Sequence, residues 1–308
     1  MKNFSLIDLN WTGRPQSIAA MLIESEGASA LIDPGPESTL ETLRSALRAR
    51  GLDFASLDFL LLTHIHLDHA AATGSIVREN PGLKVFLHEF GAPHMVDPAR
   101  LLASAGRLYG ADLKPLYGEC LPVPKDNLYP LSGGETIRIG QVQLDVFYTP
   151  GHASHHVAYW DAVSRVAFVG DNAGIRIDGK SYLLPATPPP DIDLELWNSS
   201  LDKIVSLHPD RLFLTHFAYI DNPAEHIRLY REKLRDWATL TQRLLDSGEP
   251  LETGERHFIE QISSEVRGVL PAEPAELYIF NGGLGLSWRG LVRYLKKRSL
   301  QEKPETSA

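Results

Sequence analysis

The stretch THIHLDH combines three histidines and an aspartate directly after an apolar run. Neutral imidazole nitrogens and carboxylate oxygens are suitable protein ligands for Zn²⁺, Mn²⁺ and Fe²⁺. His64 and His66 are two residues apart, so in an extended backbone both side chains point to the same side. Asp68 and His69 follow where we expect the chain to turn into a helix beginning near Ala70. Ligands on such a turn can point in two directions, which favours two adjacent metal ions over one.

Predicted strands would carry this stretch and three other coordinating residues to one place. Each of four apolar, β-rich runs ends shortly before such a residue: 58–62 before His64, 143–148 before His152, 165–169 before Asp171 and 211–214 before His216. In α/β folds the ends of the strands converge on one edge of the sheet. We therefore expect the four segments to assemble a single site.

The rest of the chain reads as further strands and helices. Additional strands are predicted at 18–23, 28–32, 84–87, 135–139 and 157–160. Amphipathic helices are predicted from Ser38 to Arg50, with Ser38 as N-cap and Gly51 closing the helix, and over 194–207. Residues 92–130 have little strand character and contain a short helix at 98–108. From residue 224 the pattern is mostly helical, and 301–308 is predicted to be a disordered tail.

Composition limits the function classes. At 308 residues, with 43% hydrophobic and 22% charged residues, the chain has the composition of a globular protein able to bury a core. The formal net charge of −9 argues against a nucleic-acid partner, which would require a basic surface. Cys120 is the single cysteine, so a disulfide framework and Cys-x-x-Cys motifs are excluded. The chain shows no apolar signal region and no run long enough to cross a membrane, so we expect a cytoplasmic protein without membrane partners.

The motif T-H-x-H-x-D-H at the end of a strand resembles the signature of the metallo-β-lactamase superfamily of metal-dependent hydrolases. Four more stretches resemble other motifs of that superfamily, in the expected order: LIDPG with Asp33, TPGHASHH with His152, FVGDNAG with Asp171 and LFLTHFA with His216. The resemblance spans residues 18–218. It implies a four-layer αββα sandwich over residues 1–222. The helical C-terminal segment predicted from the sequence pattern, 223–300, falls outside the resemblance.

The resemblance also implies a ligand set for two divalent ions, with Zn²⁺ favoured and Mn²⁺ or Fe²⁺ as alternatives. The implied ligands are His64, His66 and His152 for one ion, Asp68, His69 and His216 for the other, and Asp171 between the two. A hydroxide bridging the ions would be the nucleophile, with Asp68 and Asp171 as the catalytic carboxylates. No serine or cysteine nucleophile is then required, which fits the absence of a G-x-S-x-G motif.

Several other residues are expected near the site. Asp33 would hydrogen-bond a ligand histidine from behind, although a simple turn aspartate is an alternative. His156 is either a neighbour of the site or a structural histidine. The segment 92–130 is expected to be a lid or insert, and its apolar residues would form a substrate pocket with a Pro-rich loop. The pocket residues predicted in this way are Met95, Tyr109, Tyr182 and Leu183.

The substrate is less constrained than the site, because fold and metal motif do not choose among the known reactions. True β-lactamases of the superfamily generally lack the bridging aspartate, so Asp171 argues against that activity. An apolar lid favours a small molecule with an apolar acyl part, cleaved at a thioester or lactone as in the glyoxalase II-like or lactonase-like branch. A phosphodiesterase, a mono-iron dioxygenase and a non-catalytic, metal-stabilised binding protein are the alternatives. Homodimerisation is left open.

Overall fold

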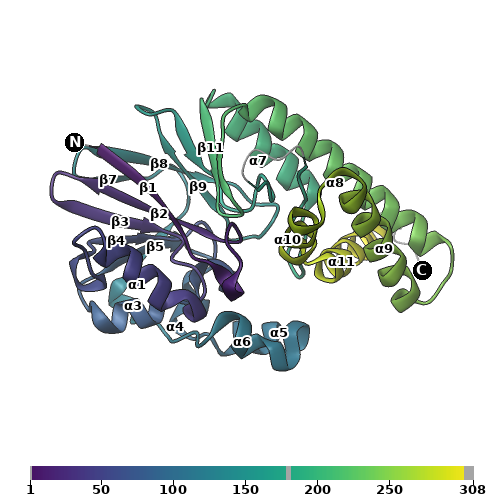
Figure 1. Cartoon of the computed structure of the whole chain (residues 1–308), viewed down its shortest axis with the longest axis horizontal. Coiled ribbons are helices and arrows are strands. Elements are labelled where there is room, and N and C mark those ends of the chain that lie inside the picture. The colour runs from purple at the N-terminus through teal and green to yellow at the C-terminus, as the bar shows by residue number, and fades with distance from the viewer. Residues whose placement is uncertain (1, 178–181, 302–308) are drawn as a thin grey trace, which may run out of the picture.

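Two six-stranded β-sheets stacked face to face form the centre of the protein (Figure 1). The structure, a computed structural model, describes residues 2–177 and 182–301. The first sheet has the order β1-β2-β3-β4-β5-β6, with the bounds Lys2–Asp8, Ala19–Ser25, Ala28–Ile32, Phe59–Leu61, Lys84–His88 and Leu128–Leu131. The second has the order β12-β11-β10-β9-β8-β7, with the bounds Ala218–Ile220, Arg211–Leu214, Val166–Phe168, Val157–Asp161, Val142–Tyr148 and Thr136–Ile139.

The sheets pack against each other through alternate side chains of their strands. On β2, Met21 faces the second sheet, whereas the next residue, Leu22, belongs to the core on the outer side. On β10, Phe168 joins the core between the sheets, whereas Ala167 joins the core behind the second sheet. Strands buried on both faces require helices on the outside of each sheet. The predicted four-layer αββα sandwich is confirmed.

Helices α1 (Leu40–Arg48) and α3 (Thr73–Glu79) cover the outer face of the first sheet (Figure 1). Their apolar side chains Leu43, Leu47 and Ile76 are fully buried in one core cluster with the outward residues of that sheet. Three more helices lie between β5 and β6 in the sequence: α4 (Ala92–Val96), α5 (Ala99–Tyr109) and α6 (Leu113–Tyr117). The helix predicted at 98–108 corresponds to α5.

Five helices lie on the outer side of the second sheet (Figure 1). They are α7 (Leu194–Ser206), α8 (Pro223–Asp246), α9 (Leu251–Val269), α10 (Ala272–Gly282) and α11 (Leu284–Gln301). Helices α9, α10 and α11 pack against α8 and one another. The large side chains Trp197, Trp237, Phe258 and Tyr278 lie in a single core cluster with the outward residues of the sheet. The predicted helical C-terminal region is therefore confirmed, and it shares a continuous apolar core with the sandwich. The predicted tail, beyond residue 301, lies outside the described residues.

One strand was not predicted because it contains a proline. The expectation of little strand character across 92–130 is wrong at its end, because Leu128–Leu131 forms β6 at the edge of the first sheet, parallel to β5. Pro130 interrupts the β pattern in the sequence, but an edge strand tolerates a residue without an N–H group. Strands β1 and β12 were not predicted either.

The predicted cap of the first helix is also wrong. Glu37–Thr39 forms a turn of 3₁₀-helix, and α1 begins only at Leu40. The hydroxyl of Ser38 instead donates to the backbone carbonyl of Leu116 at 2.6 Å. A side chain predicted to cap its own helix is thus used to attach α6. Gly51, with φ +74°, lies beyond the end of α1 at Arg48.

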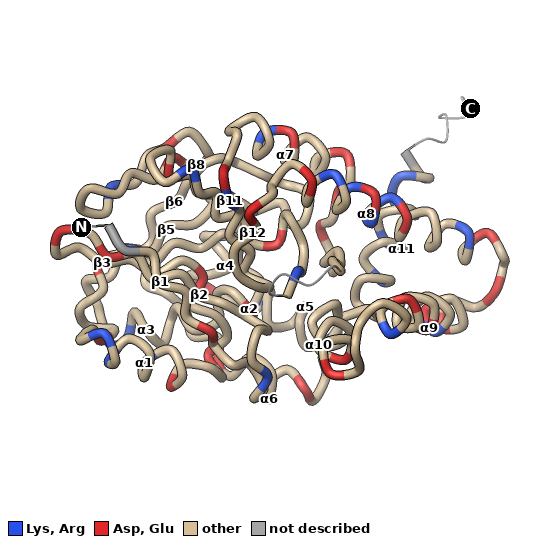
Figure 2. The backbone as a smooth tube through the Cα atoms, turned by 45° about the horizontal axis from the view of Figure 1, so that its top comes forward, with Lys and Arg blue, Asp and Glu red and all other residues tan. Residues whose placement is uncertain are grey.

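Charged residues of both signs are interspersed along the chain in the view of Figure 2. On α8, for example, Arg228 forms ion pairs with Glu225 at 2.8 Å and with Glu232 at 2.6 Å. Such exposed pairs one helical turn apart stabilise a helix modestly. Among the described residues, no helix is both long and apolar enough to cross a membrane.

Replacing Tyr159 with Phe should test a hydrogen bond between the two sheets. Tyr159 on β9 is fully buried, and its hydroxyl donates to the backbone carbonyl of Leu62 at 2.7 Å. Loss of the donor leaves a buried carbonyl without it, so the free energy of unfolding in urea should fall by about 1–3 kcal/mol. Tyr129→Phe on the exposed edge strand is the control, since that residue is 40% exposed. Equal stability of both variants would contradict this account.

Candidate metal centre

The candidate site lies where strands of both sheets end. His64 follows β4 of the first sheet, and the second sheet contributes His152 after β8, Asp171 after β10 and His216 after β11. The helix after the HxH segment begins earlier than predicted: α2 spans Leu67–Ala70, so Asp68 and His69 lie on its first turn. His66 is the last extended residue, with φ −60° and ψ 149°. The change from strand to helix at this residue separates the two pairs of side chains.

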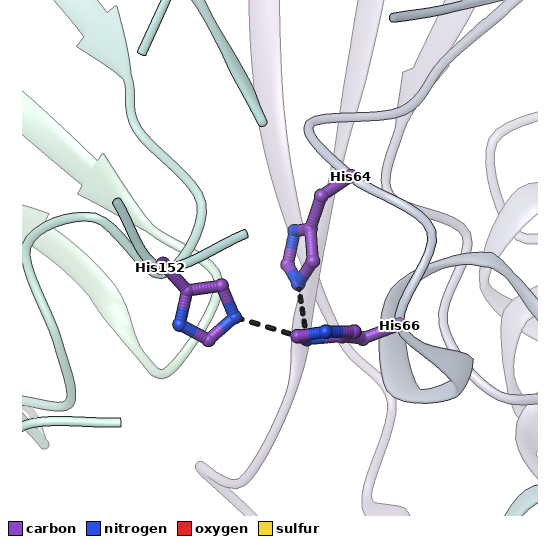
Figure 3. Close-up of side chains that lie close together, drawn as sticks. All are labelled: His64, His66 and His152. Atoms are coloured by element: carbon purple, nitrogen blue, oxygen red, sulfur yellow. Dashed lines mark hydrogen bonds between the residues drawn. The ribbon is translucent and has the colours of Figure 1, made fainter. Parts of the chain in front are cut away.

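Three histidines form the first group of possible ligands (Figure 3). Nε2 of His64 lies 3.0 Å from Nδ1 of His66, and Nε2 of His152 lies 2.9 Å from the same atom. A single imidazole nitrogen carries either one proton or one lone pair, so it cannot make good hydrogen bonds to both neighbours. Convergence of three ring nitrogens is the arrangement that a cation with N ligands requires.

Asp68, His69, Asp171 and His216 form the second group. Nε2 of His216 is 3.3 Å from Oδ2 of Asp68, and Nε2 of His69 is 3.1 Å from Oδ1 of Asp171. Ligand atoms in each group lie within 4.8 Å of one another. The structure thus brings together all seven residues that the sequence singles out as metal ligands.

Asp171 lies between the two groups. Its Oδ1 faces the second group, 3.1 Å from His69 and 3.6 Å from His216. Its Oδ2 faces the first group, 3.4 Å from Nε2 of His152. One carboxylate with an oxygen directed to each group has the geometry of a bridging ligand.

Hydrogen bonds on the side away from the site fix the orientation of four histidine rings. Their other ring nitrogens meet protein oxygens as follows: His152 Nδ1 with Ala186 O at 2.9 Å, His216 Nδ1 with Ser17 O at 2.8 Å, His69 Nδ1 with Asp33 Oδ2 at 2.9 Å and His64 Nδ1 with Thr63 Oγ1 at 3.1 Å. A carbonyl can only accept, so Nδ1 of His152 and of His216 must donate. The lone pair of each neutral ring is then on Nε2 and points into the site.

Asp33 supports the site in the way predicted from its position. Its Oδ2 accepts hydrogen bonds from Nδ1 of His69 and from the hydroxyls of Thr63 and Thr215, at 2.9, 2.7 and 3.0 Å. Its Oδ1 accepts from the backbone N–H of Thr63 at 2.8 Å. Thr63 follows β4 and Thr215 follows β11, so this buried carboxylate ties the ends of two strands from different sheets to one histidine of the site.

The histidines of the first group are neutral. Burial is the main cause that lowers the pKa of His64 well below its ordinary value, and the neighbouring imidazoles add to the effect. Burial likewise lowers the pKa of His66 to about 4. Burial also lowers the pKa of His152, against the opposing charge of Asp171. Neutral imidazoles are the form that binds a metal ion.

The second group, in contrast, requires positive charge. Burial acts to raise the pKa of Asp68, but the charges of His69 and His216 outweigh it and lower the pKa to about 2. Burial acts to lower the pKa of His69, yet the carboxylates around it, Asp171 first, raise its pKa well above its ordinary value. The surrounding carboxylates therefore favour a positive charge at this group, and a bound cation would supply it.

Two further histidines adjoin the site. His156, predicted to be either a neighbour or a structural residue, is fully buried, and its ring stacks on that of His64 with centroids 5.2 Å apart. Its Nδ1 is 2.9 Å from the hydroxyl of Thr149. His155 was missed, although it belongs to the same HASHH stretch: its ring centroid is 5.7 Å from that of His66.

Buried polar atoms without hydrogen-bond partners indicate that the residues present fit divalent cations. His69 Nε2 and Asp171 Oδ1 are buried and close together, but neither has a hydrogen-bond partner among the described residues. Buried polar atoms without partners are costly, and such an arrangement is typical of atoms that coordinate an ion. Five imidazoles and two carboxylates match Zn²⁺ and Fe²⁺ better than Mg²⁺ or Ca²⁺.

A cavity of about 210 Å³ opens onto the second group. His66, Asp68, Asp171 and His216 form its floor. Its walls come from the 3₁₀ turn at Trp11–Gly13, from α5 and α6, from the loop containing Ala186 and residues 188–190, and from the junction of α10 and α11. Most of these wall residues are apolar, and no lysine or arginine occurs among the described residues that line the cavity.

The predicted pocket residues divide into two sets. Tyr109 lines the cavity, together with other apolar residues of the 92–130 segment such as Leu101 and Leu116. Met95 is instead buried in the core behind the first sheet. Tyr182 and Leu183 are buried in the core behind the second sheet, where the ring of Tyr182 contacts that of Tyr278. These three do not line the cavity.

Sequence reasoning missed the part of the cavity wall that Trp11 and Phe280 form. Trp11 near the N-terminus and Phe280 on α10 pack together with ring centroids 5.3 Å apart. The ring of Trp11 also contacts Tyr117 at 5.6 Å, and its Nε1 donates to the carbonyl of Leu116 at 2.7 Å. The aromatic residues themselves are visible in the sequence, but no local pattern pairs them.

Two tyrosines add hydroxyl groups to this apolar wall. Tyr109 and Tyr117 contact each other with ring centroids 4.9 Å apart, and both line the cavity. Burial, with the negative charge of Asp68, raises the pKa of Tyr109 to about 12. The same two causes contribute to raising the pKa of Tyr117 well above its ordinary value. At neutral pH both hydroxyls are therefore protonated.

The fold and this arrangement of ligands agree with the family to which the chain belongs, the metallo-beta-lactamase superfamily. The sequence profile of that superfamily matches residues 13–216, about two thirds of the chain. All seven candidate ligands lie within the matched part. The resemblance stated from the motifs is thereby confirmed at the level of the superfamily.

Individual relatives are distant. The metallo-beta-lactamase fold-containing protein ST1585 of Sulfurisphaera tokodaii is 26% identical over 209 residues, covering 66% of this chain and 73% of that protein. Its crystal structure superposes with a TM-score of 0.67 at 21% identity, over 95% of this chain and 99% of that one, so the C-terminal helices are included. A hydroxyacylglutathione hydrolase of Aeromonas hydrophila is 29% identical over 215 residues, 67% of this chain and 66% of that enzyme.

A third similar protein has been solved with metal bound. The protein TTHA1623, solved in a di-iron-bound form, is 29% identical to this chain in the structural comparison. Its TM-score is 0.50, and the match covers 66% of this chain and 89% of that one.

Replacing Gly151 with Ala should disturb the site through the backbone. Gly151 precedes His152 at φ +141°, and a Cβ there would lie 2.3 Å from Cα of Trp197. Relieving this clash should move the loop that carries His152, lower stability by about 1–3 kcal/mol and weaken metal binding. Gly268→Ala on α9 is the control, because nothing lies within 4 Å of its Cβ. Thermal melting and metal titration of both variants test this, and unchanged metal affinity in Gly151→Ala would contradict it.

Proposed function

We propose that the protein is a dinuclear metal-dependent hydrolase that cleaves an ester-type bond, a thioester or lactone, in a small and largely apolar molecule. The observation that carries this proposal is the position of the ligand set. Asp68, Asp171 and His216 form the floor of a cavity whose walls are mainly apolar. A substrate held by those walls would present its polar, cleavable group to the metal-binding side chains.

Two ions would be held by residues already in place. His64, His66 and His152 would bind one ion, Asp68, His69 and His216 the other, and Asp171 would bridge them. When bound, two such ions lower the pKa of water from its bulk value toward about 7 and polarise a carbonyl oxygen. Zn²⁺ is the favoured ion on the donor set, with Fe²⁺ or Mn²⁺ as alternatives.

The protein itself would position the metal ligands and exclude water from the site. Nδ1 donation by His152 and His216 to backbone carbonyls fixes their rings, so the Nε2 lone pairs need no reorientation. The carboxylate of Asp171 keeps a constant distance between the two groups. The low pKa of Asp68, about 2, keeps this residue ionised at the floor of the cavity at neutral pH. The apolar walls keep bulk water away from the reacting carbonyl.

The relatives support a dinuclear hydrolase. TTHA1623 in its di-iron-bound form shows that a related chain holds two metal ions. The Aeromonas hydrophila relative is named as a hydrolase of hydroxyacylglutathione, an acyl-transfer substrate. The first comparison favours two metal ions for this chain, and the second favours hydrolysis at an acyl group. The complete second ligand group argues against a mono-iron dioxygenase.

The charge of the cavity narrows the substrate class. Phosphodiesters and glutathione conjugates carry negative charge, which a binding site usually meets with arginine or lysine. The described lining of this cavity includes neither. Arg14 is not among the lining residues. Its guanidinium stacks on the ring of Phe280, with the guanidinium carbon 4.0 Å from the ring centroid. An electrically neutral ester-type substrate therefore fits better than a phosphodiester.

Removal of one ligand should change the metal content. His216→Ala should lower the content of loaded protein from two ions per chain toward one, because the second group loses a nitrogen while the first keeps its three histidines. Elemental analysis after loading with Zn²⁺ measures this. The matched control is His257→Ala, since that histidine pairs with Glu249 at 3.3 Å, far along the chain on α9. One ion per chain in the unmodified protein would contradict the dinuclear proposal.

Replacement of Asp171 should lower the turnover number more than it weakens substrate binding. Asp171→Asn keeps the shape but not the charge, so kcat on a neutral ester or lactone should fall at least about 100-fold, with KM changed less. The control is Cys120→Ala: burial raises the pKa of that thiol to about 11, so it is not a nucleophile. Normal turnover by a fully metallated Asp171→Asn enzyme would refute the mechanism. No hydrolysis of any ester, thioester or lactone by the loaded native enzyme would favour a non-catalytic binding protein.

A further inference from the structure

The carbonyl of Ala186 orients one histidine of the first group. It accepts the hydrogen bond of His152 Nδ1 at 2.9 Å, and it lies in the loop of residues 182–190. The other three oriented rings meet partners close to the ends of β2, β3 and β4: Ser17, Asp33 and Thr63. Strand ends are fixed by the hydrogen bonds of the first sheet. The orientation of His152 depends instead on what fixes the loop.

This loop can make few backbone hydrogen bonds of its own. Leu184 pairs with Ile175, with N–O distances of 2.9 and 3.0 Å. Four of the next six residues, 185–190, are prolines, which have no N–H group. In this stretch only Ala186 and Thr187 can therefore donate a backbone hydrogen bond. The position of the Ala186 carbonyl must then depend on contacts between the loop and other parts of the chain.

Thr187, next to Ala186, binds Ser287 on α11. Its hydroxyl donates to the carbonyl of Ser287 at 3.2 Å, and its backbone N–H donates to the hydroxyl of Ser287 at 3.4 Å. The hydroxyl of Ser287 in turn donates to the carbonyl of Gly282, at the end of α10, at 3.1 Å. The loop lies so close to α11 that a Cβ on Gly290 would be 2.0 Å from the carbonyl oxygen of Thr187. Both Thr187 and Ser287 are buried, so these bonds are costly to leave unmade and hold the neighbouring carbonyl in one position.

The same two helices bind the loop at both of its ends. At its start the hydroxyl of Tyr278 on α10 donates to the carbonyl of Tyr182 at 2.6 Å. At its end Nε of Arg293 on α11 donates to the carbonyl of Pro190 at 3.0 Å. Both helices lie beyond residue 216, where the match to the superfamily profile ends. A part of the chain outside that match therefore fixes the loop that orients a candidate metal ligand.

We propose that α10 and α11 orient His152 for the ion bound by the first group. Ser287 holds Thr187, and Thr187 fixes the carbonyl of Ala186 that directs the ring. Thr187 and Ser287 are thus positioning residues of the metal centre and contact no ion themselves. Hydrogen-bond partners that orient metal-bound histidines typically contribute about 10- to 100-fold to metal affinity. The inference rests on the metal binding in the proposed function, but not on hydrolysis.

The variant Thr187→Val keeps the shape of the side chain and removes its hydroxyl. In a His216→Ala background the first group is the one that keeps all its histidines, and there Thr187→Val should weaken the affinity for Zn²⁺ about ten-fold. In a His64→Ala background, which leaves the second group intact, the same change should have little effect, because the histidines of that group bind partners in the sandwich. Competition with a chelator measures both affinities. Thr187→Ser retains the hydroxyl and should restore the affinity of the first group.

Thr241→Val is the matched control for a general loss of stability. The hydroxyl of Thr241 is also buried, and it donates to the carbonyl of Trp237 within α8 at 2.8 Å, without a bond to the loop. Both valine variants should lower the melting temperature by a few degrees, but only Thr187→Val should weaken zinc binding. Should Thr187→Val fail to fold, Ser287→Ala takes its place, because it removes the acceptor of the Thr187 N–H.

Zinc affinity separates this proposal from the proposed function. Unchanged affinity of the first group in a folded Thr187→Val protein would overturn the positioning role, even if the native enzyme hydrolyses esters. Equal weakening of both groups would also overturn it, since that result indicates a general structural defect. Weaker binding at the first group alone, combined with no hydrolysis of any ester, thioester or lactone by the native enzyme, would refute the hydrolase and leave the positioning role standing.

Discussion

The carboxylate of Asp33 is the interaction on which the arrangement of the site depends. It accepts hydrogen bonds from residues that follow strands of both sheets, and from the ring of His69. Because the group is buried, each bond forms in a low dielectric environment and is costly to leave unmade. The two sheets can therefore meet at this edge in only one relative position. The distances among the candidate metal ligands follow from that position, since the ligands come from the ends of strands in both sheets.

The metal-binding side chains and the cavity walls have different structural origins. The candidate ligands lie on loops and on α2, at the ends of strands of the sandwich, between His64 and His216. The walls come largely from the helices between β5 and β6 and from the helices after β12, with Trp11 and the loop at 186–190 completing them. Changes in the walls away from the contact of that loop with Ser287 can therefore alter which molecule is bound without altering the ligand geometry. This separation explains why the superfamily identifies the chemistry of the chain better than its substrate.

The candidate metal ligands and the sandwich could be predicted from the sequence because both depend on local signals. The HxHxDH motif and strands that alternate or run continuously apolar are visible over a few residues. The edge strand with Pro130 was missed because its pattern is interrupted, although its place at the edge of the sheet tolerates the proline. The cavity wall was largely missed for another reason. Whether Tyr182 faces a cavity or a core depends on Tyr278, almost a hundred residues later, and no pattern in the sequence reports such a contact.

The contact between Trp11 and Phe280 joins segments near opposite ends of the described chain, and both residues line the cavity. A molecule bound there touches both segments at once and so acts as a tether between them. By thermodynamic linkage, occupancy must then stabilise the docking of the last helices onto the sandwich by as much as that docking favours occupancy. Protection of the backbone amides of α10 and α11 from hydrogen exchange would consequently report on a ligand even in a protein whose metal sites are fully loaded.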